Sequence, residues 1–321
     1  MGQEFWSVRD KSGSQKKGVV TTLQEKLKAG HFVITAEITP PVSCEAADLV
    51  AKAAPFKDLA DAVNVTDGAG ARAHLGALTA ATILNQHGIE PILQFTCRDR
   101  NRIALQSDLL AAAASSVHNL LLLRGDDPKA GDQPDAKPVF DLDTVALTKT
   151  AAGIRDRGEL PSGRKVSGRA HFFLGAGDVP LDPPAGWMPT SLNTKIAAGA
   201  EFVQTQFCMD AAIVRRYVAR LAQDNIPDRL FILIGISPLR SAKSARWMRK
   251  KLFGTVISDA IVTRMESAID PAAEGQRICL ELLEELADIP GVAGAHLMAP
   301  GNEAAIAEVI VRAAGIKRRR A

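Results

Sequence analysis

Short runs of β-branched and aliphatic residues alternate along the chain with longer segments in which apolar residues recur every three or four positions. The short runs predict eight strands, at residues 31–38, 62–66, 91–96, 119–123, 169–174, 202–207, 230–236 and 293–298. The longer segments predict helices, at residues 45–56, 75–87, 101–115, 142–157, 194–198, 211–223 and 272–287. The chain therefore repeats one unit, a strand followed by a helix.

The predicted strands are continuously apolar, which is typical of a parallel sheet that is covered on both faces. Eight strand–helix units with right-handed crossovers favour a closed (β/α)8 TIM barrel over an open, doubly wound sheet. The length of 321 residues alone allows one or two domains. We expect a single α/β barrel domain at residues 21–316, between a flexible leader at residues 1–20 and a basic tail at residues 317–321.

Charge and cysteine content exclude several classes of protein. The chain has 39 Lys and Arg against 36 Asp and Glu, a net charge of +3, and residues 317–320 carry four of the positive charges. The basic excess thus belongs to the tail, and we expect no nucleic-acid-binding face on the folded part. The four cysteines show no CxxC spacing, which argues against a disulfide framework and against a zinc site.

Targeting signals and common catalytic motifs are also missing from the sequence. The N-terminal residues lack the apolar core of a secretory signal, and no apolar run approaches the roughly 18 residues that a membrane helix needs. No GxGxxG, P-loop, HExxH or GxSxG pattern occurs, so metal hydrolysis and P-loop chemistry have no support. We expect a cytoplasmic protein without a membrane partner or a metal, in which Cys97 and Cys208 are small buried side chains rather than nucleophiles.

Glu37 is a candidate for acid–base chemistry. It interrupts an otherwise apolar predicted strand in the run T-A-E-I-T-P-P, and the two prolines stiffen the turn that follows. In an apolar barrel interior the charged form of a carboxylate is disfavoured, which suits a general acid. The alternative interpretation is an outward-facing or salt-bridged Glu.

Two long loops follow predicted strands, at residues 125–140 and 176–189, and should lie at the C-terminal face, where barrels place their active sites. The first begins within the run R-G-D-D-P. There Gly125 lets a ligand approach the backbone, Arg124 offers a planar cation, and Asp126 or Asp127 offers an acceptor. Ordinary turn chemistry explains the same tetrapeptide.

Further polar candidates lie at or near the ends of other predicted strands. In F-V-Q-T-Q-F, Gln204 and Gln206 share a face by the period of two, and an amide at the barrel mouth can both donate to and accept from a heterocycle. A strand Gln that is satisfied by backbone groups is the alternative. Thr66 and Gln94 end neighbouring strands, and Lys195, which by itself would be taken as a solvated helix residue, is placed to reach a phosphate.

Six segments, taken in order, resemble the methylenetetrahydrofolate reductase family over residues 33–238: A-E-I-T-P-P, V-T-D-G-A, Q-F-T-C, L-L-R-G-D-D-P, L-N-T-K-I-A-A-G-A and T-Q-F. The resemblance implies a (β/α)8 barrel that holds FAD at the C-terminal ends of its strands. It also implies interconversion of 5,10-methylenetetrahydrofolate and 5-methyltetrahydrofolate, with hydride passing from NADH or NADPH through the flavin.

The resemblance implies roles for individual residues. Glu37 matches the general acid, Asp126 the acidic residue that tunes flavin and pterin, and Gln206 the glutamine that contacts the pterin. In such an enzyme the protein supplies orientation and electrostatics, because the cofactor carries the hydride. The implied cofactor-binding residues are Thr66, Ala69, Gln94, Arg124, Gly125, Asp126, Ala176 and Lys195.

Several positions depart from the family pattern. Gln94 stands where a His is frequent, Ala242 stands where some members have a Phe, and M-A-P-G-N-E lacks the Arg used for the folate glutamate tail. The electron donor therefore stays open among NADH, NADPH and a protein partner, and we expect a homo-oligomer. Two other functions compete with a reductase: a folate-binding methyltransferase barrel that acts with a corrinoid protein, and an accessory subunit without cofactor.

Overall fold

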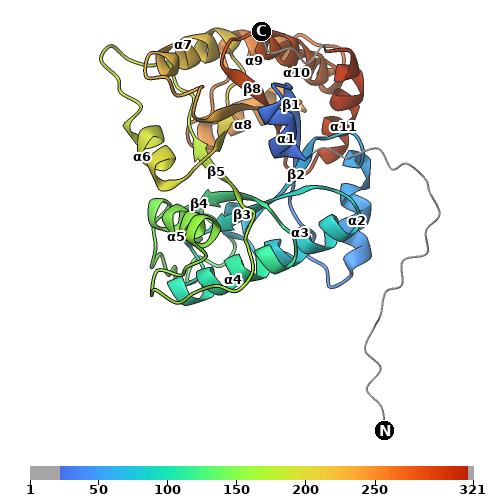
Figure 1. Cartoon of the computed structure of the whole chain (residues 1–321). Coiled ribbons are helices and arrows are strands. Elements are labelled where there is room, and N and C mark those ends of the chain that lie inside the picture. The colour runs from blue at the N-terminus through green and yellow to red at the C-terminus, as the bar shows by residue number, and fades with distance from the viewer. Residues whose placement is uncertain (1–21, 317–321) are drawn as a thin grey trace, which may run out of the picture.

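The chain forms a closed barrel of eight parallel strands in sequential order, so the predicted (β/α)8 fold is confirmed (Figure 1). A computed structural model describes residues 22–316; the leader and the basic tail predicted at the two ends lie outside the described residues. The strands are β1 (Val33–Ile38), β2 (Ala62–Val65), β3 (Pro91–Thr96), β4 (Asn119–Leu123), β5 (Phe173–Asp178), β6 (Phe202–Phe207), β7 (Phe231–Ile236) and β8 (Val292–Leu297).

Helices surround the strands (Figure 1). They are α1 (Leu23–Lys28), α2 (Ala46–Ala53), α3 (Ala77–Gln86), α4 (Arg102–Ala114), α5 (Thr144–Arg157), α6 (Thr190–Ala198), α7 (Ala211–Ala222), α8 (Ala242–Lys251), α9 (Asp259–Glu266), α10 (Pro271–Ala287) and α11 (Glu303–Arg312). Short 3-10 turns lie at Ala54–Phe56, Ala69–Ala71, Pro128–Ala130 and Ala313–Gly315. No helix within residues 22–316 combines the length and the apolar character needed to cross a membrane.

The fifth strand lies four residues later than residues 169–174, where the sequence pattern put it. Glycines at 175 and 177 weaken the strand signal of F-L-G-A-G-D. Packing inside the barrel explains Gly175, because a Cβ there would lie 2.2 Å from Cζ of Phe202. The residue expected at the start of the second long loop, Ala176, is therefore a buried residue within β5.

Four helices had no counterpart in the prediction: α1, α8, α9 and α11. Helix α8 reads A-K-S-A-R-W-M-R-K-K and buries only Ala245 and Met248, so it has too few apolar residues to stand out in the sequence. Helix α1 is a single short helix with a capping box between Thr22 and Glu25. Its Leu23 and Leu27 close the N-terminal end of the barrel by packing on the innermost apolar residues.

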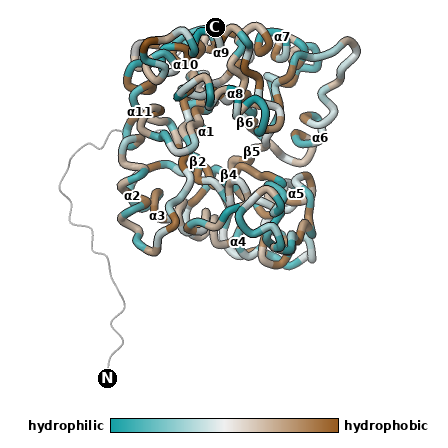
Figure 2. Tube along the Cα trace, turned by 180° about the vertical axis from the view of Figure 1, so that it is seen from behind, coloured by the Kyte–Doolittle hydropathy of each residue, from teal (hydrophilic) through white to brown (hydrophobic). Residues whose placement is uncertain are grey.

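The barrel interior is apolar at the α1 end and polar in the middle. Hydrophobic and hydrophilic positions alternate along the trace of the surrounding helices (Figure 2). The apolar layer consists of Val33, Ala62, Ile92, Leu121, Phe173, Phe202 and Leu233. Nearer the C-terminal end the strands bury polar side chains, at Thr35, Asn64, Gln94, Gln204 and His296. Branched apolar side chains usually fill a barrel interior, so this polar layer marks the end of the barrel where a site is expected.

Glu90 joins α1 to the barrel. Both of its carboxylate oxygens accept from the Leu23 backbone N–H, at 3.0 and 3.1 Å, and Oε1 also accepts from Nδ2 of Asn119 at 2.8 Å. Burial raises the pKa of Glu90 above its ordinary value, and the hydrogen bonds offset only part of this effect. The folded protein therefore binds this proton more tightly than the unfolded chain, and stability falls as pH rises through the window between the two pKa values.

We expect Glu90→Gln to remove this loss. One amide oxygen in the place of Oε1 keeps both acceptor contacts, while no charge is buried. The free energy of unfolding of the variant, relative to the native chain, should therefore increase as pH rises from about 4 to 7. Urea titrations across this range test the prediction. A difference that does not change with pH would show that the Glu90 charge is already well solvated.

Candidate functional site

Predicted site residues from four strands lie at the C-terminal end of the barrel. Glu37 lies in β1, Thr66 follows β2, Gln94 lies in β3 and Gln206 in β6. Gln94 and Glu37 are in direct contact, since Nε2 of Gln94 donates to Oε2 of Glu37 at 2.7 Å. The Glu37 side chain is 17% exposed, so it is accessible from the barrel mouth and still mostly enclosed.

The surroundings of Glu37 are more polar than the apolar interior that the sequence led us to expect. Besides Gln94, the imidazole of His296 lies on the neighbouring strand, with its Nε2 3.5 Å from Oε2 of Glu37. Both groups can present an N–H to the carboxylate, and N–H donors stabilise a carboxylate in a partly buried site. Glu37 is thus contacted by side chains from two other strands, β3 through Gln94 and β8 through His296.

Behind Glu37, polar side chains are hydrogen-bonded to one another across the barrel interior. Nδ1 of His296 lies 3.0 Å from the Thr35 hydroxyl, which accepts from Nε2 of Gln204 at 3.1 Å. Gln204 and Asn64 exchange two amide hydrogen bonds, of 2.6 and 3.0 Å. The expectation that Gln204 serves the mouth beside Gln206 is therefore wrong: Gln204 is 4% exposed and satisfied inside the barrel.

Gln206 lies beyond Gln204, where the pairing of β6 with β7 shifts register. Its side-chain oxygen accepts from the backbone N–H of Phe207 at 3.0 Å, which leaves its amide N–H2 free of any hydrogen bond among residues 22–316. The side chain is half-buried at the rim. It is therefore placed to donate to a ligand at the barrel mouth, in contrast to Gln204.

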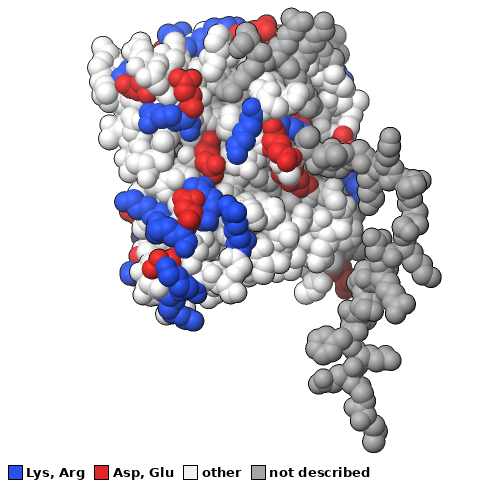
Figure 3. All heavy atoms as spheres, viewed as in Figure 1, with Lys and Arg blue, Asp and Glu red and all other residues white. Residues whose placement is uncertain are grey.

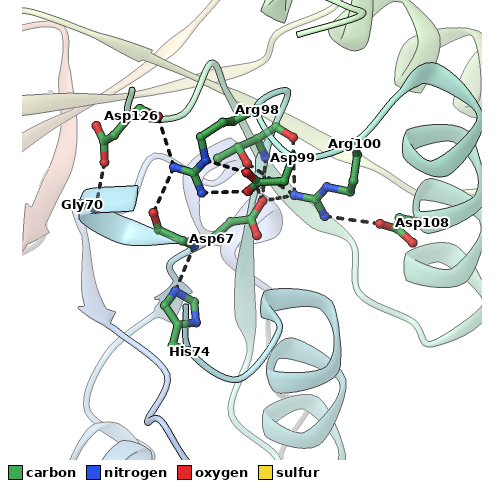
Figure 4. A network of polar contacts seen from close by, with 10 residues as sticks. Asp67, Gly70, His74, Arg98, Asp99, Arg100, Asp108 and Asp126 are labelled. Carbon is green, nitrogen blue, oxygen red and sulfur yellow. Dashed lines mark hydrogen bonds and ion pairs between the residues drawn. The ribbon is translucent and has the colours of Figure 1, made fainter. Parts of the chain in front are cut away.

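The loops after β2 and β4 are tied together by a buried arginine (Figure 4). Nη1 of Arg98 donates to the backbone oxygens of Gly68 at 3.1 Å and of Asp126 at 3.3 Å. Asp99 accepts two further hydrogen bonds from the same guanidinium, both 2.8 Å. The Asp126 carboxylate in turn accepts from the Gly70 N–H at 2.8 Å. Asp126 is thus fixed from two sides, and Arg98 was not among the predicted residues.

A second ion pair supports the same loops. Asp67 accepts from both the backbone N–H and the hydroxyl of Thr96, at 2.8 Å each, and pairs with Arg100. Arg100 also reaches Asp108 on α4, at 3.3 Å. The run C-R-D-R following β3 supplies both guanidinium groups, and this clustering of charge directly after a strand was the signal available in the sequence.

Two of the predicted cofactor-binding residues, Arg124 and Lys195, already contact other residues of the protein. Arg124 lies over the ring of Phe140, 4.3 Å from its centroid. Lys195 on α6 donates to the Gly177 backbone oxygen at 2.6 Å and lies 3.6 Å from Asp178, which is also hydrogen-bonded by Tyr217. Lys195 therefore points to the end of β5, where an anionic ligand would have to compete with Asp178.

Features of the barrel mouth fit a bound aromatic cofactor. The Thr66 hydroxyl is buried and has no hydrogen-bond partner among residues 22–316, which is unusual for a buried polar atom and leaves it available to a ligand. Gly125 adopts φ of +90°, and a Cβ there would lie 2.9 Å from Cβ of Arg98. The backbone after β4 thus follows a path that favours glycine strongly over any residue with a Cβ.

Metal and thiol chemistry find no support in the part of the chain that the structure describes. No group of three His, Cys, Asp or Glu residues in residues 22–316 is arranged to hold a metal ion. Burial raises the pKa of the Cys97 thiol to about 11 and that of Cys208 to about 12. Cys279 is also buried, and only Cys44 is exposed. The interpretation of Cys97 and Cys208 as small buried side chains agrees with these findings.

We accordingly expect a water-soluble thiol reagent at neutral pH to modify one thiol, that of Cys44, because thiolate concentration and access are both suppressed at the other three. Cys44→Ser should abolish the rapid reaction, and unfolding in guanidinium should expose all remaining thiols. Reaction kinetics followed by absorbance check this. Rapid labelling of the Cys44→Ser protein would reveal an opening of the barrel that the structure does not show.

Charged side chains of both signs lie near one another on the surface of the described residues. On the face shown in Figure 3, Lys and Arg side chains are interspersed with Asp and Glu rather than gathered in a patch of one sign. Ion pairs such as Arg102 with Asp141, at 2.7 Å, and Arg216 with Asp182, at 2.8 Å, account for several of these neighbours. Exposed pairs of this kind contribute little to stability.

The fold is that of a (β/α)8 barrel protein, and polar side chains gather at its C-terminal face, where enzymes with this fold place their active sites. The family described as Methylenetetrahydrofolate reductase matches residues 22–314, and the chain belongs to this family. This agrees with the resemblance seen in the sequence motifs.

Two curated relatives are longer than the present chain. "Probable methylenetetrahydrofolate reductase (NADPH)" of Caenorhabditis elegans is 25% identical over 239 residues, covering 72% of this chain and 33% of the relative. "Methylenetetrahydrofolate reductase 2" of Saccharomyces cerevisiae (strain ATCC 204508 / S288c) is 24% identical over 263 residues, covering 76% and 40%. The chain thus spans about a third to two-fifths of the curated relatives that it matches.

Among solved structures, a protein from Clostridium thermocellum shares the fold with a TM-score of 0.61 and 14% identity, covering 91% of this chain and 97% of that one. It is described as an uncharacterized protein that binds two copies of 5-methyl-5,6,7,8-tetrahydrofolic acid. At this identity the likeness establishes the barrel architecture alone.

Proposed function

We propose that this chain is a flavin-dependent oxidoreductase that interconverts 5,10-methylenetetrahydrofolate and 5-methyltetrahydrofolate, with Glu37 as the general acid. The observation that carries the proposal is the placement of Glu37 at the barrel mouth, 17% exposed and held by Gln94 and by the neighbouring His296. Family membership supports the reaction class. The names of the worm and yeast relatives and the ligand of the Clostridium thermocellum protein agree with a folate substrate.

FAD would lie at the C-terminal ends of the strands, and when bound it supplies hydride transfer between a nicotinamide nucleotide and the folate. Support comes from the buried Thr66 hydroxyl, which has no hydrogen-bond partner among residues 22–316, and from the backbone at Gly125, whose φ of +90° favours glycine. The residues proposed to hold it are Thr66, Ala69, Gln94, Arg124, Gly125, Asp126, Ala176 and Lys195.

The chain's own side chains would orient the folate and move its proton. Glu37 gives a proton to the substrate nitrogen whose bond to the one-carbon unit breaks, and Gln94 steadies the carboxylate that is left. Gln206 contacts the pterin through its free amide N–H2. Asp126, fixed by Gly70 and the Arg98 guanidinium, places a negative charge beside the reacting rings.

The electron donor and the assembly are part of the same proposal. NADH and NADPH are both proposed as donors, and the name of the worm relative favours NADPH. We further propose a cytoplasmic homo-oligomer, with no nucleic acid and no membrane as partner. A protein electron donor would replace the nucleotide if neither nucleotide reduces the bound flavin.

Flavin titration followed by anaerobic half-reactions tests the proposal. We expect the protein to bind FAD, to bleach with NADPH or NADH, and to regain its yellow colour on addition of 5,10-methylenetetrahydrofolate. Absence of flavin binding together with absence of folate-dependent turnover would refute it. Folate binding without flavin, with methyl transfer to a corrinoid protein, would instead identify a methyltransferase, and loss of both ligands would identify an accessory subunit.

A further inference from the structure

His296 is a buried histidine that contacts Glu37 but gives and takes no proton in the proposed reaction. It lies in β8, is 2% exposed, and pairs in register with Thr35 of β1 at the seam where the barrel closes. Its two ring nitrogens face different partners. Nε2 lies 3.5 Å from Oε2 of Glu37, and Nδ1 lies 3.0 Å from the hydroxyl of Thr35.

A series of hydrogen bonds leads from Asn64 through Gln204 and the Thr35 hydroxyl to Nδ1 of His296, and the donor of each bond can be assigned. Gln204 uses its Nε2 to donate to Oδ1 of Asn64 at 3.0 Å and to Oγ1 of Thr35 at 3.1 Å, while its Oε1 accepts from Nδ2 of Asn64 at 2.6 Å. The Thr35 oxygen thus already accepts a hydrogen bond, and its own proton has two acceptors within reach: Nδ1 at 3.0 Å and the Ala295 oxygen at 3.4 Å. The nearer acceptor is the ring nitrogen.

The contact at Nε2 of His296 favours the same direction of these hydrogen bonds. With the Thr35 hydroxyl donating to Nδ1, the proton of the imidazole sits on Nε2 and faces the Glu37 carboxylate. Turning both amides over would reverse each link and move the proton to Nδ1. A bare Nε2 would then face Oε2 of Glu37, the oxygen that already accepts from Gln94 and so leaves the acid proton to Oε1; this would set acceptor against acceptor in a buried site, which is unfavourable.

We propose that His296 is a positioning residue for Glu37, held in its Nε2–H tautomer by the hydrogen-bond chain that runs from Asn64 and Gln204 through Thr35. This role of His296 rests on the proposed function. When Glu37 passes its proton to the folate nitrogen, the carboxylate that remains accepts from Nε2–H of His296 and from the Gln94 amide, and no proton leaves the ring. The separation of 3.5 Å shortens as that charge forms, as hydrogen bonds in catalytic sites commonly do.

The tautomer can be measured without any turnover. In protein labelled with 15N at histidine, long-range proton–nitrogen correlations distinguish Nε2–H, Nδ1–H and doubly protonated rings, and His296→Asn identifies the resonances. We expect the Nε2–H form in the native chain and in Thr35→Ser, which keeps the hydroxyl. Thr35→Val, which removes the hydroxyl, should lose the preference. An Nδ1–H or a doubly protonated ring in the native chain at neutral pH overturns the proposal.

Two replacements of His296 test its role in turnover. A Gln can place an amide N–H where Nε2 lies, whereas an Asn can reach only the position of Nδ1. We expect His296→Asn to lower kcat for folate reduction about tenfold to a hundredfold with little change in KM, and His296→Gln to recover most of it. Equal losses, or no loss in either variant, overturn the role. Absence of folate turnover in the native chain would refute the proposed function and leave the tautomer assignment standing.

Discussion

Glu37→Gln is expected to lower kcat for the folate reaction by about 10²–10⁴-fold, the usual contribution of a positioned general acid. A Gln at this position keeps an oxygen that accepts from Nε2 of Gln94, so the side chain should stay in place. What it loses is the proton that the substrate nitrogen must receive. Stopped-flow measurement of the folate half-reaction, with KM determined in parallel, checks the prediction.

The same variant should still bind FAD and bleach with NADPH or NADH, because those steps require no proton from Glu37. Glu90→Gln provides the matched control, since it makes the same replacement at the α1 end of the barrel, where Glu90 contacts only structural groups. Its turnover should equal that of the native chain. Unchanged turnover in Glu37→Gln would remove Glu37 from the reaction and favour the accessory-subunit interpretation.

The barrel was predictable because parallel strands that are covered on both faces are continuously apolar. β3, β4 and β6 begin and end where the pattern put them, since each of the runs P-I-L-Q-F-T, N-L-L-L-L and F-V-Q-T-Q-F directly follows a polar residue, Glu90, His118 or Glu201. β5 was placed four residues too early because glycines weaken its strand signal, and the reason for Gly175, the packing of Phe202, lies in another strand. Helix α8 was not predicted, because it buries only two side chains.

The candidate site was predictable where a residue acts from its own strand end. Glu37, Thr66 and Gln206 could be found in this way, because each polar side chain follows or interrupts an apolar run. The partners that hold them could not be found. Thr35 and His296 are 261 positions apart and meet only because β1 pairs with β8 when the barrel closes.

The buried charge of Arg98 illustrates the same limit. In the sequence it is one of three arginines within residues 98–102, and nothing in the pattern distinguishes it from exposed Arg102. In the fold its guanidinium fills the space beside Gly68, where a Cβ would lie 2.0 Å from Nη2 of Arg98. The position of Asp126 therefore depends on loops after three different strands, a relation that only the folded barrel reveals.

Gly125→Ala should be strongly disruptive for a change of a single methyl group. Its φ of +90° is strained for any residue with a Cβ, and the added atom would lie 2.9 Å from Cβ of Arg98 and 3.1 Å from Cβ of Thr96. Strain and overpacking together predict a loss of about 2–5 kcal/mol in the free energy of unfolding. Urea titration measures this loss, and FAD titration should show weakened binding because the loop that carries Asp126 must move.

Gly70→Ala is the control that separates strain from overpacking. Gly70 also has a positive φ, of +62°, but a Cβ there meets nothing within 4 Å among the described residues. This variant should therefore lose only about 1 kcal/mol, the cost of the left-handed backbone. Equal losses in the two variants would mean that Arg98 and Thr96 yield freely to the new methyl group. The packing of the loops after β3 and β4 would then not be what fixes Asp126, and the support for Asp126 as a pre-positioned charge beside the reacting rings would fall with it.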